Sequence, residues 1–276
     1  MGPSEELSGS RLNLLSALGV HRKEVISLVG GGGKTTLMLA LACEIVANGS
    51  TVVMTTTTKI RRPTDVEAHL IVDTDEARLV SRTIGAIGDY RHITLASEYL
   101  PEDKLKGISR GLVDILIGLD EVSFVIVEAD GAAGKPLKAP NNFEPVIPWS
   151  TSLVIPVVGL DALGQRLSPD IALRQDIVSR LTGLVPGEKI HAEAIATLLI
   201  HEKGLTKGSP NHARIIPFLN KLDSVTHLSE AQNLARIILR KGQGQIERVI
   251  LGQLNLLEPI IHVVHGENLT DCSTPL

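Results

Sequence analysis

A run of glycines followed by a lysine and two threonines is the part of this chain most suited to chemistry; its residues are Gly30, Gly31, Gly32, Gly33, Lys34, Thr35 and Thr36. An apolar run precedes it, and an apolar helical pattern follows. Glycine has no Cβ, so such a loop can bring its backbone N–H groups close to a polyphosphate at a helix N-terminus. We expect Lys34 to reach the β- and γ-phosphates and the Thr35 hydroxyl to bind Mg²⁺. The run therefore predicts a nucleoside triphosphate as ligand.

The spacing of the glycines departs from the usual P-loop motif. That motif has a further glycine five residues before Gly33, and this chain has Leu28 there. The short form Gly30-x-x-Gly33-Lys34-Thr35-Thr36 resembles the P-loop of Mur-type ligases. A plain glycine-rich turn is the alternative, but a lysine and two threonines at the helix start favour phosphate binding. ATP-dependent ligation or phosphoryl transfer thus stays open beside NTP hydrolysis.

Threonines and a lysine follow the second predicted strand, residues 51–55. If this strand lies beside the P-loop, the hydroxyls of Thr57 and Thr58 and the ammonium of Lys59 can contact phosphate or a Mg²⁺-bound water. Threonine also favours strands, so a threonine-rich strand edge is the alternative. We expect a role in nucleotide binding for Thr57 and Thr58 and in catalysis for Lys59.

Two acidic residues, Glu128 and Asp130, end the apolar run 124–127. Alternate residues of an extended chain share one side, so both carboxylates can face the same site. We expect one of them to hold Mg²⁺ or its water and the other to orient the nucleophile; the pattern leaves the assignment open. The glycines and prolines that follow predict a loop that responds to the γ-phosphate. Lys135 and Lys138 in this loop are either anion-binding or solvated.

The residues Asn220, Lys221, Leu222 and Asp223 follow another predicted strand, 215–219. Asn-Lys-x-Asp at a strand end resembles the guanine-reading signature of GTPases. A carboxylate can accept hydrogen bonds from the guanine N1–H and N2–H₂ groups, which adenine lacks. The pattern favours GTP over ATP, and a turn capped by Asp223 is the alternative. Asp161, after the strand 153–158, either faces the nucleotide or substrate or caps a turn.

Composition restricts the class of protein. The 276 residues are 43% hydrophobic and 2% aromatic with a net charge of −4, which argues against nucleic-acid binding. The two cysteines form no CxxC pair, and the histidines lack the spacing of metal ligands. No apolar run reaches transmembrane length, and no leader pattern opens the chain. We therefore expect a cytoplasmic protein without a membrane partner.

These motifs need a sheet to position them. Apolar runs alternate with helical patterns at 35–48, 74–86 and 103–118, after a short helix predicted at 7–18. This alternation predicts an α/β fold with a mostly parallel sheet covered by helices on both faces. Ligands of such sheets bind at the carboxyl ends of the strands, where all the motifs lie. We expect a single P-loop NTPase domain over 1–276 with a small helical insertion at about 161–212.

Together with Val-Val-Gly-Leu-Asp-Ala-Leu-Gly at 157–164, these motifs resemble the YqeC family over about residues 20–265. The resemblance implies an accessory factor for selenium-dependent molybdenum hydroxylases that helps to make or insert a selenium-containing cofactor. A hydroxylase or a cofactor-assembly protein would then be the partner. The organisation also resembles the GTPases that insert metals into hydrogenase and urease, but without their Cys/His cluster.

Three hypotheses follow for the activity. The chain is a Mg²⁺-dependent NTP hydrolase in cofactor maturation, an ATP-dependent small-molecule ligase or phosphotransferase, or a nucleotide-gated binding chaperone for a hydroxylase. In the last case, the loop 129–148 would contact the hydroxylase.

Overall fold

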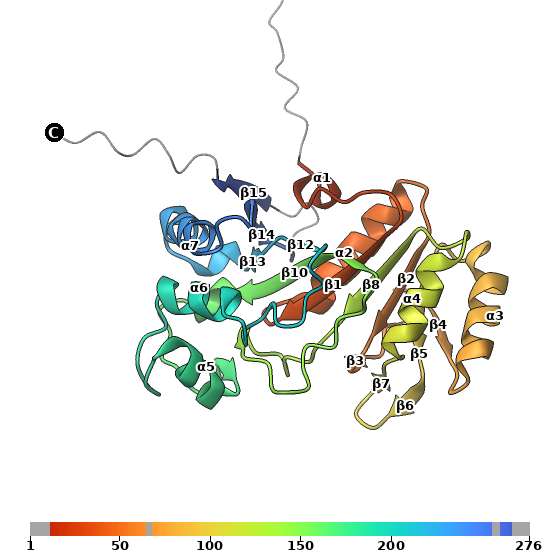
Figure 1. Ribbon diagram of the computed structural model, residues 1–276, viewed down its shortest axis with the longest axis horizontal. Coiled ribbons are helices and arrows are strands. Elements are labelled where there is room, and N and C mark those ends of the chain that lie inside the picture. Colours follow the sequence, from red (N-terminus) through yellow and green to blue (C-terminus); the bar gives the residue numbers. More distant parts are fainter. Residues whose placement is uncertain (1–11, 65–67, 256–259, 267–276) are drawn as a thin grey trace, which may run out of the picture.

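The computed structural model describes residues 12–64, 68–255 and 260–266, and its centre is a ten-stranded sheet (Figure 1). All neighbouring strands run parallel except β14 and β15. In order across the sheet they are β15 (Ile260–His265), β14 (Arg248–Gln253), β13 (Phe218–Asn220), β10 (Thr151–Gly159), β1 (Glu24–Gly30), β8 (Phe124–Glu128), β2 (Val52–Thr56), β5 (His92–Ala96) and β4 (His69–Val72), with β12 (Arg214–Ile215) also beside β10.

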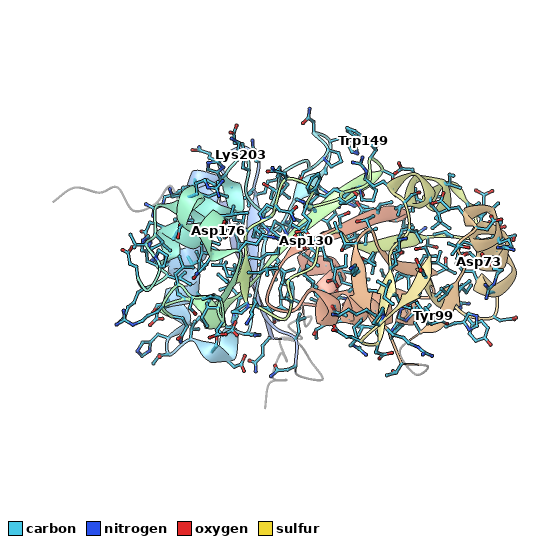
Figure 2. All side chains as sticks on the ribbon, turned by 90° about the horizontal axis from the view of Figure 1, so that it is seen from below. Asp73, Tyr99, Asp130, Trp149, Asp176 and Lys203 are labelled. Carbon is cyan, nitrogen blue, oxygen red and sulfur yellow. The ribbon has the colours of Figure 1, made fainter. Side chains whose placement is uncertain are left out.

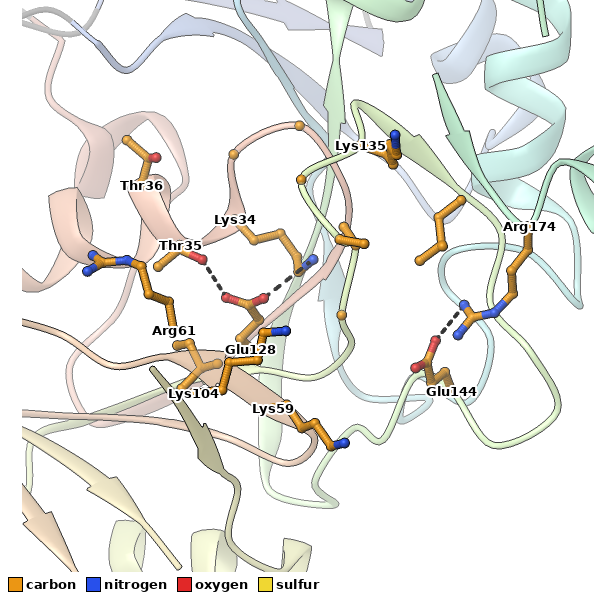
Figure 3. Close-up of a pocket in the computed structure, with 18 of the residues that line it drawn as sticks. Lys34, Thr35, Thr36, Lys59, Arg61, Lys104, Glu128, Lys135, Glu144 and Arg174 are labelled. Atoms are coloured by element: carbon orange, nitrogen blue, oxygen red, sulfur yellow. Dashed lines mark hydrogen bonds and ion pairs between the residues drawn. The ribbon is translucent and has the colours of Figure 1, made fainter. Parts of the chain in front are cut away.

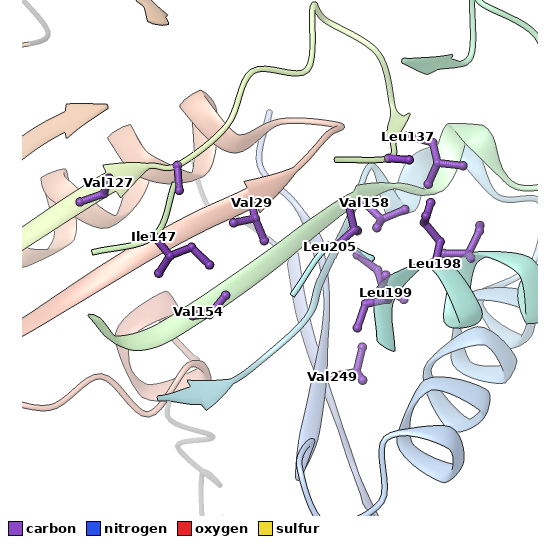
Figure 4. Packing of buried hydrophobic residues seen from close by; sticks show 14 of the residues in the cluster. Val29, Val127, Leu137, Ile147, Val154, Val158, Leu198, Leu199, Leu205 and Val249 are labelled. Carbon is purple, nitrogen blue, oxygen red and sulfur yellow. The ribbon is translucent and has the colours of Figure 1, made fainter. Parts of the chain in front are cut away.

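The central strand β1 explains why these runs form a sheet covered on both faces. All seven of its residues are buried. Because side chains alternate, Ile26 and Leu28 enter one apolar core while Val25 and Val29 enter the other. Burial of each such side chain contributes about 1.5–3 kcal/mol. Figure 4 shows part of the second core, between the sheet and the helix that carries Leu198 and Leu199.

Helices cover both faces, as the sequence predicts. One core is closed by α1 (Leu14–Ala17) and α2 (Lys34–Ala47). The other core contains residues of α3 (Glu76–Ile87), α4 (Arg110–Gly118), α5 (Gln175–Thr182), α6 (Ala192–Ile200) and α7 (Leu228–Lys241). The expected α/β fold with a mostly parallel sheet is confirmed, and it is consistent with a P-loop NTPase-like fold.

The helix predicted at 103–118 is wrong in its first part. Residues Lys104–Lys106 form β7, which lies between β3 (Lys59–Arg61) and β6 (Glu98–Leu100) in a small antiparallel sheet. Only Leu105 of the three β7 residues is buried, which is the period of a strand. The helix begins at Arg110, where the Ser109 hydroxyl accepts a hydrogen bond from the Leu112 N–H.

Two other predicted elements differ from the structure. The helix predicted at 7–18 covers only Leu14–Ala17 of the described residues, and residues 7–11 lie outside them. The strand predicted at 215–219 is divided into β12 and β13, since Pro217 has no N–H to donate to a neighbouring strand.

The stretch 161–212 joins the sheet to the loop after β8. It contains α5, α6 and the short β11 (Ala172–Leu173), which pairs with β9 (Leu137–Lys138) of that loop. The stretch is therefore mostly helical, as the sequence predicts, but it also contributes the β11–β9 pairing, for which the sequence has no signal.

Candidate functional site

The glycine-rich loop joins the end of β1 to the start of α2, and its backbone requires glycine. Gly32 and Gly33 have φ values of 80° and 127°, which residues with a side chain rarely adopt. A Cβ on Gly32 would collide with the backbone of Gly159, and one on Gly33 with the side chain of Asn220. The loop is thus held between the ends of β10 and β13 at the carboxyl edge of the sheet.

Lys34 begins α2 and is almost completely buried. Its ammonium donates a 2.6 Å hydrogen bond to the Gly30 carbonyl. It also lies 3.2 Å from Asp130 Oδ1 and 3.6 Å from Glu128 Oε1. Three other residues that the sequence predicts for the site, Gly30, Glu128 and Asp130, therefore surround the Lys34 ammonium.

Glu128 lies at the end of β8, directly beside β1 in the sheet, with Leu28 as its register partner. The Thr35 hydroxyl donates a 2.9 Å hydrogen bond to Glu128 Oε2 (Figure 3). Burial raises the pKa of Glu128, and the nearby Lys34 charge and the Thr35 hydrogen bond lower it only in part. A hydroxyl and a carboxylate thus meet at the first turn of α2, and both are hard oxygen donors of the kind that Mg²⁺ binds.

Asp130 has different surroundings from Glu128, although both follow β8. It is fully buried in the middle of the molecule (Figure 2). Both of its oxygens accept hydrogen bonds of 3.1 Å from the Gly30 N–H. It also forms an ion pair of 3.0 Å with the fully buried Lys138. These contacts fix the junction between β1 and the glycine loop.

A row of alternating charges continues from Asp130 to the start of α5. Lys138 lies 2.8 Å from Glu144 Oε2, which in turn lies 2.8 Å from Arg174 Nη1. Burial would raise the pKa of Glu144, but hydrogen bonds and charge from Lys138 and Arg174 outweigh it and lower that pKa. The row links the P-loop to the stretch 161–212.

The threonines after β2 lie next to the end of β8. Thr56 donates a 2.7 Å hydrogen bond to the Glu128 carbonyl, and Thr57 donates one of 2.7 Å to the Val146 carbonyl. Thr58 and the exposed Lys59 line a recess with Gly131 and Glu144. Of the predicted set, Thr58 and Lys59 therefore face a cavity, while the Thr57 hydroxyl bonds to the loop.

The Asn-Lys-x-Asp segment lies on the other side of the P-loop. Asn220 is buried and donates a 2.8 Å hydrogen bond to the Gly32 carbonyl. Lys221 lines the same cavity as the P-loop and forms a 2.5 Å ion pair with Asp161. Asp223 is exposed and does not line that cavity.

The cavity at the P-loop has a volume of about 590 Å³, within the size range of ligand pockets. Among the residues that the structure describes, its wall is strongly basic: it has two acidic residues, Glu128 and Glu144, and seven basic ones, Lys34, Lys59, Arg61, Lys104, Lys135, Arg174 and Lys221. Figure 3 shows all of these but Lys221. Ala133, Arg174 and Lys221 in this wall have positive φ without being glycine. Such backbone strain concentrates at functional sites.

Sequence reasoning missed Arg61, Lys104, Glu144 and Arg174 as cavity residues. For Arg61 and Lys104 a signal exists, since Lys59-Ile60-Arg61 and Lys104-Leu105-Lys106 both alternate charged and apolar residues. Glu144 and Arg174 come from irregular segments, and no local pattern indicates where they lie.

Two classes of feature are missing from the described part of the chain. It contains no group of three or more His, Cys, Asp or Glu residues arranged to hold a metal ion. None of its helices has the length and apolar character needed to cross a membrane.

Comparison with known proteins places these features in a family. A family model described as "YqeC protein" matches residues 26–176, which include the P-loop, Glu128, Asp130 and Glu144. A relative from Escherichia coli (strain K12), "Uncharacterized protein YqeC", is 31% identical over 234 residues, or 84% of this chain and 88% of the relative. The chain therefore belongs to the YqeC family, as the sequence motifs indicate.

Proposed function

We propose that this protein is a Mg²⁺-dependent nucleoside triphosphatase. The observation that carries the proposal is the 2.9 Å hydrogen bond between Thr35 and Glu128 at the end of a glycine-rich loop. Mg²⁺ in proteins is bound by one or two side chains together with the phosphates of a substrate. The Thr35 hydroxyl and the Glu128 carboxylate, directly or through water, fit that donor set. Bound there, the ion would neutralise charge on the β- and γ-phosphates.

The remaining P-loop residues would bind the phosphates. The N–H groups of Gly33 to Thr36 stand at the start of α2, where the helix dipole favours an anion, whereas those of Gly31 and Gly32 donate to the Val157 and Lys135 carbonyls. Lys34 is held at the loop by the Gly30 carbonyl and by two carboxylates. A triphosphate would replace some of these contacts with charge-assisted hydrogen bonds to phosphate oxygens.

The different surroundings of the two carboxylates support different roles. Glu128 lines the cavity and contacts Thr35, so we assign it to the metal and the attacking water. Asp130 is fully buried and has Gly30, Lys34 and Lys138 as partners. We assign Asp130 to positioning the loop and Lys34, rather than to a metal contact.

The nucleotide is proposed to be GTP in preference to ATP. Asn220 fixes the start of the Asn-Lys-x-Asp segment against Gly32, and Lys221 lines the cavity. A base stacked beyond the P-loop on this side would meet that segment, where the Asp223 carboxylate would read the guanine N1–H and N2–H₂ groups.

Calorimetry and a turnover assay test the proposal. We expect GTP to bind in the presence of Mg²⁺, and Lys34→Ala to abolish both binding and turnover. Unchanged binding and turnover in Lys34→Ala would overturn the P-loop assignment. A preference for ATP that Asp223→Asn leaves unchanged would overturn only the guanine assignment.

We further propose that the nucleotide cycle serves the biosynthesis or insertion of a selenium- and molybdenum-containing hydroxylase cofactor, with a hydroxylase or an assembly protein as partner. This rests on membership of the YqeC family and the role that the resemblance implies. The test is to delete the gene and measure hydroxylase activity and selenium content in the host. Wild-type protein, but not Lys34→Ala, should restore both.

A further inference from the structure

The small sheet beside the P-loop presents an unusual concentration of positive charge. In β3 and β7 the central residues, Ile60 and Leu105, are buried, and the four flanking residues are exposed cations. Because side chains alternate along a strand, the four cations share the opposite face of the sheet. Lys59 lies directly opposite Lys106, and Arg61 lies directly opposite Lys104.

Such an arrangement is unfavourable unless an anion balances it. Residues directly opposite in an antiparallel pair have Cβ atoms about 4.5–5.5 Å apart, and like charges there destabilise the sheet. Lys106 is balanced by Glu98 at 3.3 Å, and Lys104 by Glu102 at 2.6 Å. Lys59 has no ion-pair partner among the residues that the structure describes.

Three of the four cations line the P-loop cavity: Lys59, Arg61 and Lys104. The fourth, Lys106, does not. Figure 3 shows Arg61 on the side of Glu128 opposite Lys135 and Arg174, with Lys104 and Lys59 beside and below Glu128. An adjoining recess of about 330 Å³, lined by Thr58, Lys59, Gly131 and Glu144, enlarges the space at this end. The basic group therefore borders an open cleft large enough for a small molecule.

The sheet order decides which end of a nucleotide this group would meet. β13 and β2 lie on opposite sides of β1. The base is proposed to face the Asn220–Asp223 segment after β13. The triphosphate would then cross the P-loop toward Glu128, and its terminal phosphate would point to the side of β2 and β3. Lys59, Arg61 and Lys104 thus lie beyond the terminal phosphate.

We infer that Lys59, Arg61 and Lys104 form a second anion-binding subsite, which holds a small substrate with a carboxylate or phosphate group next to the γ-phosphate. The inference rests on the proposed nucleotide site and adds the class of the second substrate. An oxygen of an anionic acceptor held there would lie close to the γ-phosphorus, and its attack would form a new P–O bond as the bond to the β-phosphate oxygen breaks and the nucleoside diphosphate leaves. The subsite thus favours the ligase or phosphotransferase alternative, in which the acceptor takes the place that water has in the proposed hydrolysis.

Calorimetry on the full chain tests the subsite in two steps. First, the protein is saturated with Mg²⁺ and a non-hydrolysable GTP analogue, or the ATP analogue if that binds better. Inorganic phosphate and, separately, citrate are then titrated into the saturated protein. We expect one anion to bind per chain, and the tighter of the two probes identifies the preferred group. The Arg61→Ala/Lys104→Ala double variant should bind it at least tenfold more weakly.

Lys106→Ala is the matched control, because it removes a cation from the same face of the same strand but outside the cavity. It should bind the anion as the wild type does. All the substituted side chains are exposed, and thermal unfolding verifies that the variants are folded. Lys59→Gln adds a second readout: it should lose the anion-induced rise in Tm without lowering the Tm of the free protein.

The possible results distinguish failure of the anion-binding subsite from failure of the nucleotide site. If the nucleotide binds but neither phosphate nor citrate does, the subsite is overturned and the nucleotide site stands. If the double variant loses affinity for the nucleotide as strongly as for phosphate, the cations serve the triphosphate and the subsite is likewise overturned. If the wild type binds no nucleotide, the proposed function fails and the subsite fails with it.

Discussion

The side-chain amide of Asn220 donates a 2.8 Å hydrogen bond to the carbonyl oxygen of Gly32. Asn220 ends β13 and Gly32 lies in the loop after β1, and these two strands do not pair, since β10 lies between them. Asn220 pairs in register with Gly159 of β10, and Gly159 is also the residue against which Gly32 packs. The glycine loop is therefore fastened across three strand ends, and its shape depends on a residue almost two hundred positions away.

Replacing Asn220 with alanine should loosen the P-loop. The Gly32 carbonyl loses its donor, and the Leu254 N–H loses the 3.3 Å hydrogen bond that it donates to Asn220 Oδ1. Buried polar groups without partners cost about 1–3 kcal/mol each. We expect a lower Tm and about tenfold weaker nucleotide binding if about 1.4 kcal/mol of that cost falls on the site.

Asp223→Ala is the control for that variant. Asp223 is exposed, so its removal should leave Tm unchanged and affect only the choice between guanine and adenine. Wild-type affinity and Tm in Asn220→Ala would show that the cross-strand hydrogen bond does not support the loop.

The sequence predicts the sheet and the strand-end motifs because their signals are local. Every residue of β1, β2 and β8 is buried, so these strands read as continuous apolar runs, and the polar residues follow at their carboxyl ends. The glycines and Lys34 likewise mark the glycine-rich loop and the start of α2 by type and spacing, and its binding of phosphate stays a prediction.

The remainder of the site depends on contacts that no local pattern contains. Arg174 enters the cavity wall because β11 pairs with β9. Lys138, which could be read as a solvated loop lysine, is fully buried between Asp130 and Glu144. Lys138 is buried because the loop after β8 folds so that its two carboxylates lie on either side of the lysine. That arrangement belongs to the tertiary structure and has no local sequence signal.

Lys138 should therefore be essential for stability. Its removal leaves the buried Asp130 and the partly buried Glu144 each without one positive partner. Breaking a buried ion pair in this way costs about 3–5 kcal/mol. We expect Lys138→Met to lower the free energy of unfolding, measured in urea, by about 3–5 kcal/mol.

Lys135→Ala is the control. It removes a neighbouring lysine whose 3.7 Å partner, Asp170, is exposed, and it should lower the free energy of unfolding by less than about 1 kcal/mol. Equal effects of the two variants would contradict the interpretation.

Glu144 should make the fold sensitive to acid. The partners Lys138 and Arg174 hold the pKa of Glu144 in the folded protein below its ordinary value of 4.5. A depressed carboxylate pKa contributes stability above the unfolded-state pKa, and that contribution is lost as the pH falls through the folded-state value. Glu144→Gln should thus be less stable than the wild type at neutral pH, with the difference shrinking below about pH 4.5. Urea midpoints measured from pH 7 to pH 3 test this, and a difference that does not change with pH would refute it.

The two threonines at the start of α2 should differ in their effects. Thr35 contacts Glu128, whereas Thr36 is exposed in the cavity wall and has no contact with that carboxylate. Thr35→Ala should therefore weaken Mg²⁺ binding and raise the Mg²⁺ concentration for half-maximal turnover about tenfold or more. Thr36→Ala should change nucleotide affinity while leaving the Mg²⁺ requirement intact. A Mg²⁺ titration of both variants at saturating nucleotide decides the matter, and equal shifts would remove the metal assignment from Thr35.

Glu128 should show a conflict between stability and activity. Burial raises its pKa above the ordinary 4.5, so the folded protein binds the proton more tightly than the unfolded chain does. Stability from such a group is complete below the unfolded-state pKa and is lost as the pH rises through the folded-state pKa. At pH 7, above the unfolded-state pKa, this contribution is reduced, and the neutral isostere avoids the cost of burying a carboxylate there. Glu128→Gln should raise Tm at pH 7 and decrease Mg²⁺-dependent turnover by about 100-fold, as expected for loss of the carboxylate assigned to the metal and the attacking water. Asp130→Asn is the contrasting variant: it disturbs the buried contacts to Lys34 and Lys138 and should lower Tm. If Glu128→Gln lowered Tm and kept its turnover, Glu128 would be a structural acid and the metal side of the site would have to be reassigned to Asp130.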